Sequence, residues 1–113
     1  MQRENRLRDR RDFRRVFKYG KSAANRHFVL YAMVKREGGP PRVGVSISKK
    51  VSKHAVDRNR VKRLVKEVVR PLIGHIPDGR DLVIIAREPA DDLDYRQVED
   101  SLRHLFKKTG LLK

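Results

Sequence analysis

One predicted helix carries a row of five cationic side chains and one asparagine. The row consists of Arg58, Asn59, Arg60, Lys62, Arg63 and Lys66, and Lys49 and Lys50 precede it at the end of a predicted strand. Arginine grips phosphate oxygens with two N–H groups, lysine adds a point charge, and asparagine offers a donor and an acceptor to a base edge or a 2′-hydroxyl. These residue types on one helix face predict a nucleic-acid contact.

The charge of the whole sequence supports this interpretation. Lys and Arg number 29 against 14 Asp and Glu, which gives a formal net charge of +15. Residues 1–70 hold 22 basic and 6 acidic side chains, whereas residues 71–113 hold 7 and 8. Clustered cations of this kind displace counterions from a polyanion. A solvated surface is the alternative, but Glu67 is the only acid among residues 58–70, and ordinary surface helices mix their charges.

Aromatic side chains supply a second candidate surface. Phe13 and Phe17 lie four residues apart on a predicted helix, and Tyr31 lies on a predicted strand. Rings flanked by cations can stack on the bases of a single strand. The spacing alone nevertheless favours the core for both phenylalanines, because large aromatic residues on one helix face are usually buried.

The sequence shows no recognisable set of catalytic side chains. An independent nuclease needs metal-binding carboxylates or a histidine acid–base pair. The four histidines are widely separated: His27, His54, His75 and His104. The acidic residues Asp91, Asp92 and Asp94 precede a predicted helix, where they are interpreted as capping groups. We expect no catalytic residue, no metal ligand and no small-molecule substrate site in this protein.

Hydrophobic periodicity predicts the elements that position these side chains. Helices are expected over 9–19, 55–70 and 94–108, and strands over 27–35, 42–48 and 81–87, with 22–25 as an optional edge strand. Pro71 and Gly74 are expected to end the central helix. Since no linker divides the chain, we predict a single domain over 1–113 of the α+β class, with one mixed sheet and the order α-β-β-β-α-β-α.

Composition also predicts the compartment. The chain has no cysteine, and its longest apolar run, Phe28 to Val34, has seven residues. A membrane-spanning helix needs about 20, and the arginine-rich N-terminus lacks the apolar segment of a signal peptide. These observations predict a cytoplasmic protein with no membrane partner.

The segment from Ala55 to Leu64, AVDRNRVKRL, resembles the signature of the protein subunit of bacterial ribonuclease P. Further matches to that family cover 12–20, 28–31, 42–50, 81–87 and 101–106, so the resemblance spans nearly the whole chain. The loop 51–54 departs from the family because it lacks a frequent glycine. This departure leaves the loop geometry open but removes no candidate RNA-binding residue.

The resemblance implies the small basic subunit of a ribonucleoprotein that removes the 5′ leader from precursor tRNA. A catalytic RNA partner would carry the active centre and the Mg²⁺ ions, and the protein would bind that RNA and the leader. The cationic row would face RNA, while Phe13, Phe17 and Tyr31 would line a leader cleft between the first helix and the sheet. The family fold, shared with a ribosomal protein domain, also implies a left-handed βαβ crossover. A ribosomal or other RNA scaffold protein is the alternative, and it needs no site for a mobile single strand.

Overall fold

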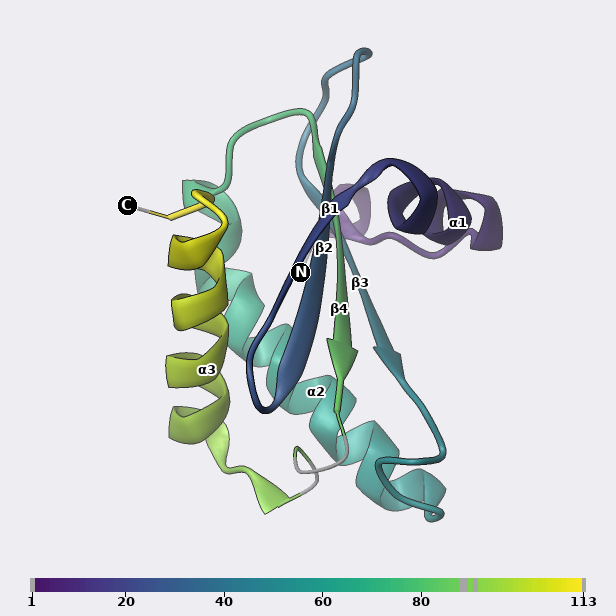
Figure 1. Cartoon of the computed structure of the whole chain (residues 1–113), viewed down its shortest axis with the longest axis vertical. Helices are drawn as coiled ribbons and strands as arrows, with labels where there is room; N and C mark the ends of the chain where they lie inside the picture. Colours follow the sequence, from purple (N-terminus) through teal and green to yellow (C-terminus); the bar gives the residue numbers. More distant parts are fainter. Residues whose placement is uncertain (1, 88–89, 91, 113) are drawn as a thin grey trace.

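Three α-helices and four strands form the fold across residues 2–87, 90 and 92–112, which the computed structural model describes (Figure 1). The helices are α1 (Arg10–Tyr19), α2 (Ala55–Leu72) and α3 (Tyr95–Lys108), with short 3-10 helices η1 (Arg3–Asn5) and η2 (Ile73–His75). The strands are β1 (Lys21–Ala24), β2 (Phe28–Val34), β3 (Arg42–Ile47) and β4 (Arg80–Ala86). The predicted order of elements is confirmed, and the optional edge strand is present as β1.

The strands form one mixed sheet in the order β1-β2-β4-β3. β2 pairs antiparallel with both β1 and β4, whereas β3 and β4 are parallel and are joined through α2. In Figure 1 both parallel strands run downward, β3 lies to the right of β4, and α2 passes behind the sheet. This crossover is left-handed, as the family resemblance implies, although about 98% of such connections are right-handed.

The alternation of side chains along β2 and β4 divides the interior between two sheet faces. Leu30 and Ile84 belong to the main core beneath α2 and α3. Met33 and Val83 point to the opposite face and form a smaller cluster with Val16 of α1. β4 is therefore buried on both faces, as its continuous apolar sequence predicts.

Helix α2 continues through Pro71, where the sequence indicates an end. Proline removes one backbone donor from the helix, but here it lies next to the last helical residue, so few hydrogen bonds depend on it. Leu72 follows it and is 2% exposed in the main core. The chain then tightens into η2 before it reaches Ile76, which is also buried.

Gly44 on β3 allows α1 to approach the sheet closely. A Cβ atom at this position would lie 2.5 Å from Cζ of Phe13 and 3.1 Å from the carbonyl oxygen of Leu7. The first separation is shorter than any ordinary carbon contact, so a side chain here would displace the ring or the strand. The glycine is thus required by the position of Phe13.

We expect Gly44→Ala to lower the free energy of unfolding by about 1–3 kcal/mol through this overpacking, measured by urea denaturation. Gly74→Ala is the matched control, because nothing lies within 4 Å of its added methyl. Equal losses of stability in the two variants would contradict the assignment of Gly44 to this contact.

Candidate nucleic-acid interface

The cationic row predicted from the sequence lies on α2, opposite the helix face that packs against the sheet. Val61, Val65 and Val68 are fully buried on the packed face. Of the row, the exposed members are Asn59, Arg60, Lys62 and Arg63, and the half-buried members are Arg58 and Lys66. Lys49 and Lys50 are exposed in the turn that follows β3. The helix therefore offers one continuous basic surface.

Two arginines of this surface also bind neighbouring loops. Nη1 of Arg58 donates to the carbonyl oxygen of Ser52 at 2.9 Å, in the loop between β3 and α2. Nη2 of Arg60 donates to the carbonyl oxygen of Leu93 at 2.9 Å, just before α3. Because a guanidinium carries five N–H donors, such a bond is compatible with a phosphate contact by the same side chain. The sequence pattern predicted the basic character of both residues but not their part in holding the loops.

The loop 51–54 forms without the glycine that is frequent in the family. None of the residues other than glycine in the described part of the chain has a positive φ. Val51 is 5% exposed and packs into the main core, and the Ser52 hydroxyl donates to Asp57 of α2 at 3.0 Å. The loop geometry that the sequence left open is thus one that any residue adopts.

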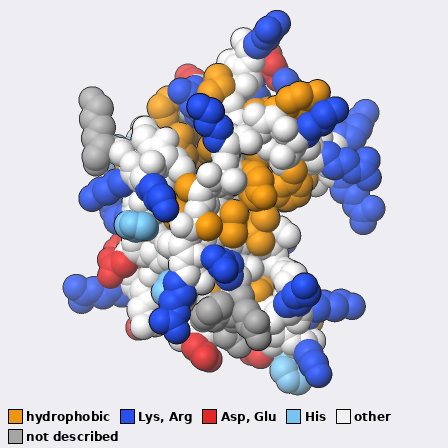
Figure 2. All heavy atoms as spheres, in the orientation of Figure 1, with side chains coloured by type: hydrophobic (Ala, Val, Ile, Leu, Met, Phe, Trp, Pro, Cys, Tyr) orange, Lys and Arg blue, Asp and Glu red, His pale blue; other side chains and the backbone are white. Residues whose placement is uncertain are grey.

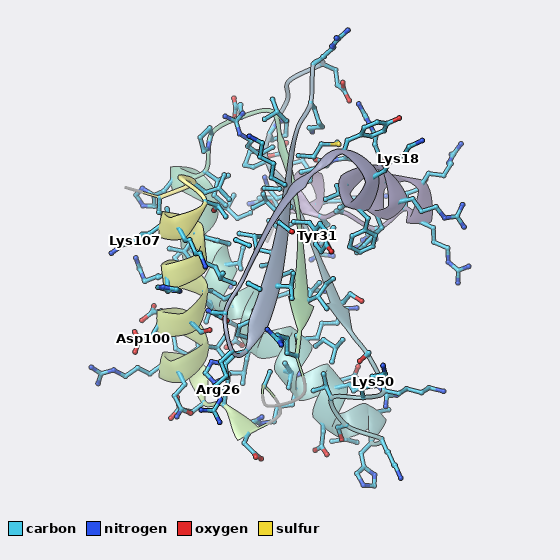
Figure 3. The ribbon with its side chains drawn as sticks, viewed as in Figure 1. Lys18, Arg26, Tyr31, Lys50, Asp100 and Lys107 are labelled. Atoms are coloured by element: carbon cyan, nitrogen blue, oxygen red, sulfur yellow. The ribbon has the colours of Figure 1, made fainter. Side chains whose placement is uncertain are left out.

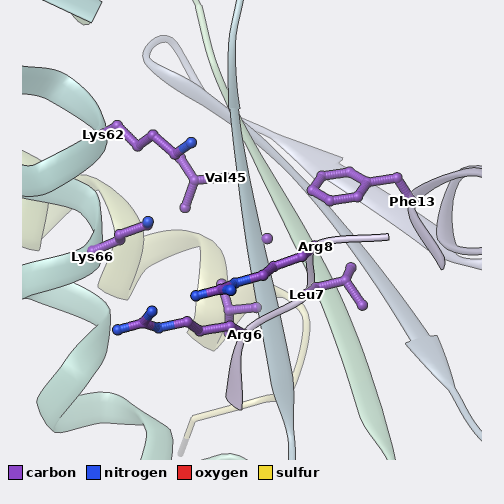
Figure 4. A pocket seen from close by; sticks show the side chains of 9 residues that line it. Arg6, Leu7, Arg8, Phe13, Val45, Lys62 and Lys66 are labelled. Carbon is purple, nitrogen blue, oxygen red and sulfur yellow. The ribbon is translucent and has the colours of Figure 1, made fainter. Parts of the chain in front are cut away.

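A basic cavity of about 310 Å³ opens at the edge of β3, between the N-terminal segment and α2 (Figure 4). Its cations are Arg6, Arg8, Lys62 and Lys66. Desolvation lowers the pKa of Lys66, and repulsion from Lys62, Arg6 and Arg8 lowers it further. The lowered pKa of Lys66 reflects the closeness of these cations, and an anion bound in the cavity would reduce their repulsion.

Arg6 and Arg8 are candidate site residues that the sequence analysis missed. Leu7 between them is 4% exposed and packs beneath α1, and Arg6 pairs with Val43 in an isolated parallel bridge. An extended segment directs alternate side chains to opposite sides. The Arg-Leu-Arg alternation was therefore a readable signal, but its pairing with β3 was not readable from local sequence.

The three predicted aromatic residues form one cluster on the sheet face that α1 partly covers. The ring centroids of Phe17 and Tyr31 lie 5.0 Å apart with an edge-to-face geometry, and those of Phe13 and Phe17 lie 6.4 Å apart. Phe17 is 42% exposed, whereas Phe13 and Tyr31 are half-buried. Phe13 and Tyr31 thus pack partly against the smaller apolar cluster, as the spacing favours for Phe13, whereas Phe17 is exposed at the surface.

Cations lie beside this aromatic cluster on the side of the basic cavity. Figure 2 shows apolar side chains gathered in the middle of the face, with Lys and Arg around them. In the view of Figure 3, Tyr31 lies between Lys18 on α1 and Lys50 beyond β3. Phe13 lines the basic cavity as well as the cluster. The aromatic and basic surfaces therefore meet at the edge of β3.

Among the acidic residues that precede α3, Asp94 has a structural role. Asp94 caps α3: its side chain accepts from the N–H of Gln97, whose side chain accepts in return. Asp92 is exposed, and Asp91 lies outside the described residues. No group of three or more His, Cys, Asp or Glu within 2–87, 90 and 92–112 is placed to hold a metal ion. The same stretch of chain contains no helix long and apolar enough to cross a membrane.

Comparisons with known proteins agree with this geometry. The family model described as Ribonuclease P matches residues 1–110. The ribonuclease P protein component of Bacillus velezensis is 47% identical over 113 residues, covering 100% of this chain and 96% of that protein. The same component of Bacillus cereus is 43% identical over 111 residues, covering 98% and 96%.

Solved structures show the same fold. The ribonuclease P protein of Staphylococcus aureus superimposes with a TM-score of 0.88 at 38% identity, covering 96% of this chain and 98% of that chain. The ribonuclease P protein of Thermotoga maritima gives a TM-score of 0.79 at 36% identity, with 91% and 96% covered. With its signature helix, left-handed crossover and full-length relatives, this chain belongs to the ribonuclease P protein family.

Proposed function

We propose that this chain is the protein subunit of ribonuclease P, which binds the catalytic RNA and the 5′ leader of precursor tRNA and so promotes removal of the leader. The observation that carries the proposal is the junction at β3 of a basic surface and an aromatic cluster. A stable RNA scaffold needs the first surface alone. A protein that binds and releases a single strand uses both the basic surface and the aromatic cluster, because aromatic rings stack on bases of any sequence.

We assign the contact with the catalytic RNA to the basic surface of α2. Asn59, Lys62 and Arg63 are exposed, and Lys49 and Lys50 extend the surface toward the end of β3. Arg58 and Arg60 fix the loops on either side while presenting their guanidinium groups along the same helix. Phosphate contacts of this kind supply affinity and position the protein, and they carry little sequence information.

We assign the leader to the aromatic cluster of Phe13, Phe17 and Tyr31. The exposed Phe17 offers a stacking face, and Tyr31 supports its ring from the sheet. Cleavage itself is assigned to the RNA subunit with its Mg²⁺ ions. In support of that division, the carboxylates Asp12 and Asp81 form ion pairs within the fold, and Asp94 caps α3.

Cleavage of a precursor tRNA at low Mg²⁺ tests this function, with the protein alone, a bacterial ribonuclease P RNA alone, and the two mixed. We expect cleavage in the mixture, because neutralised phosphates lower the demand for metal ions. Cleavage by the protein alone would place the active centre in the protein. A mixture no faster than the RNA alone would favour the scaffold alternative.

Phe17→Ala is expected to weaken binding of precursor tRNA to the holoenzyme by about 5- to 150-fold, the equivalent of one stacked base. Binding of mature tRNA, which lacks the leader, should be unchanged. Lys62→Ala is the contrasting variant: it should weaken assembly with the RNA subunit and lower the salt slope of that binding by about 0.7–0.9. Equal losses for both tRNAs with Phe17→Ala would argue against the leader assignment.

Sulfate or phosphate is expected to raise the melting temperature of the free protein by roughly 5–10 °C at ten times its Kd, since an anion in the basic cavity binds the folded chain only. Lys66→Ala should reduce this increment, and Arg96→Ala, an exposed cation on α3, should not. Chloride at the same ionic strength separates specific binding from screening. A melting temperature indifferent to sulfate would rule out the cavity as an anion site.

A further inference from the structure

Four charged side chains join α1 to the sheet beside the aromatic cluster. Arg42 on β3 donates from Nε and Nη2 to the two carboxylate oxygens of Asp81, at 2.9 and 2.7 Å. Its Nη1 donates to Oδ2 of Asp12 on α1, at 3.2 Å. Nζ of Lys35, just beyond β2, lies 3.2 Å from the same Asp81. Arg42 is thus the one member of this group that contacts both the sheet carboxylate and the helix carboxylate.

The charge balance of this group explains why α1 docks at this place. The side chains of Lys35 and Asp81 are 6% and 1% exposed, so both charges are removed from water. Asp81 can neutralise only one of its two cationic neighbours. Asp12 supplies the second negative charge, which brings the group to zero net charge when α1 is in position. An unpaired charge at a partly buried site is strongly unfavourable, so this balance specifies the docked helix.

Helix α1 buries few apolar side chains against the sheet, so its position depends strongly on these polar contacts. Among the described residues of the ten-residue helix, Val16 alone is buried. Asp12 immediately precedes Phe13 and lies about 1.4 helical turns before Phe17. A change in the tilt or register of α1 would therefore move both rings relative to Tyr31, which is fixed on β2.

We propose that Arg42 and Asp12 are positioning residues for leader binding: their hydrogen bond holds α1 at the place where Phe13 and Phe17 complete the aromatic cluster with Tyr31. Neither side chain contacts the leader in this proposal. The inference rests on the leader-binding function proposed above. It adds that the affinity for the leader depends on an ion pair that lies beside the aromatic cluster and does not touch the leader.

A second ion pair of α1 provides a matched comparison. Arg15 donates to both carboxylate oxygens of Glu37, at 2.9 and 3.4 Å, and this bond lowers the pKa of Glu37 to about 2. Both side chains are largely exposed, at 42% and 55%, and exposed ion pairs contribute little. Glu37→Gln and Asp12→Asn each remove one negative charge near α1, so they alter the overall attraction for RNA equally.

The experiment measures the affinity of the reconstituted holoenzyme for precursor and mature tRNA and takes their ratio. We expect Asp12→Asn to lower this ratio about five-fold, at the lower end of the loss expected for Phe17→Ala, because the rings are displaced and not removed. Glu37→Gln should leave the ratio unchanged, and Asp12→Glu, which restores the charge, should recover it. The affinity of Asp12→Asn for the RNA subunit should match that of Glu37→Gln, because both variants lose one negative charge.

Two further readouts separate positioning from a loss of folding. Arg42→Lys keeps the charge beside Asp81 but loses the forked geometry, so it should lower the ratio in the same direction. Ring proton shifts of Tyr31 in the free protein should move with Asp12→Asn and not with Glu37→Gln.

The ratio also distinguishes this proposal from the function on which it rests. A drop with Phe17→Ala but none with Asp12→Asn would overturn the positioning role and leave leader binding intact. No drop with Phe17→Ala would overturn leader binding by the cluster, and the positioning role with it.

Discussion

The buried carboxylate of Asp81 constrains the arrangement of four elements at once. Asp81 lies near the start of β4 and is fully buried. Its carboxylate accepts hydrogen bonds from Arg42 of β3 and forms an ion pair with Lys35, which follows β2. Removing Asp81 would leave the ammonium group of Lys35 as an uncompensated charge in the interior, at a cost of about 3–5 kcal/mol. The two cations in turn require Asp12, so α1 is tied to the same centre. The ends of three strands and the position of one helix therefore follow from a single electrostatic requirement.

Charge is treated in opposite ways on the two sides of this molecule. Around Asp81 the cations are paired, desolvated and used to build the fold. On α2, within the described part of the chain, Lys62, Arg63 and Lys66 form no ion pair within 4 Å. Selection for stability alone would have mixed acids into that helix. Binding of a polyanion would reduce the repulsion among these exposed cations, so their arrangement is consistent with an anionic partner that stabilises the folded protein.

Local periodicity predicted the elements well because each helix and strand here has one dominant apolar pattern. The capping pair Asp94 and Gln97 was equally readable, since its hydrogen bonds span only three residues. Features that depend on contacts between distant parts of the sequence could not be predicted in this way. The handedness of the crossover came from the family resemblance, and the basic cavity depends on Arg6 pairing beside Val43 across 37 positions of sequence. The exposure of Phe17 was also unreadable, because Val16 takes the inward position on a helix that covers only part of its sheet face.

Arginine rather than lysine at positions 58 and 60 follows from the double task of these side chains. An ammonium that binds a loop carbonyl is a single point of contact, whereas a guanidinium can donate to a carbonyl on one edge and to a phosphate on another. The bonds to Ser52 and Leu93 thus tie the basic helix α2 to the segments on either side of it. One of these segments leads back to Lys49 and Lys50, at the edge shared with the aromatic cluster. If α2 contacts the large RNA as proposed, a phosphate bound at Arg58 lies beside the loop that leads back to β3, where the basic surface meets the aromatic cluster.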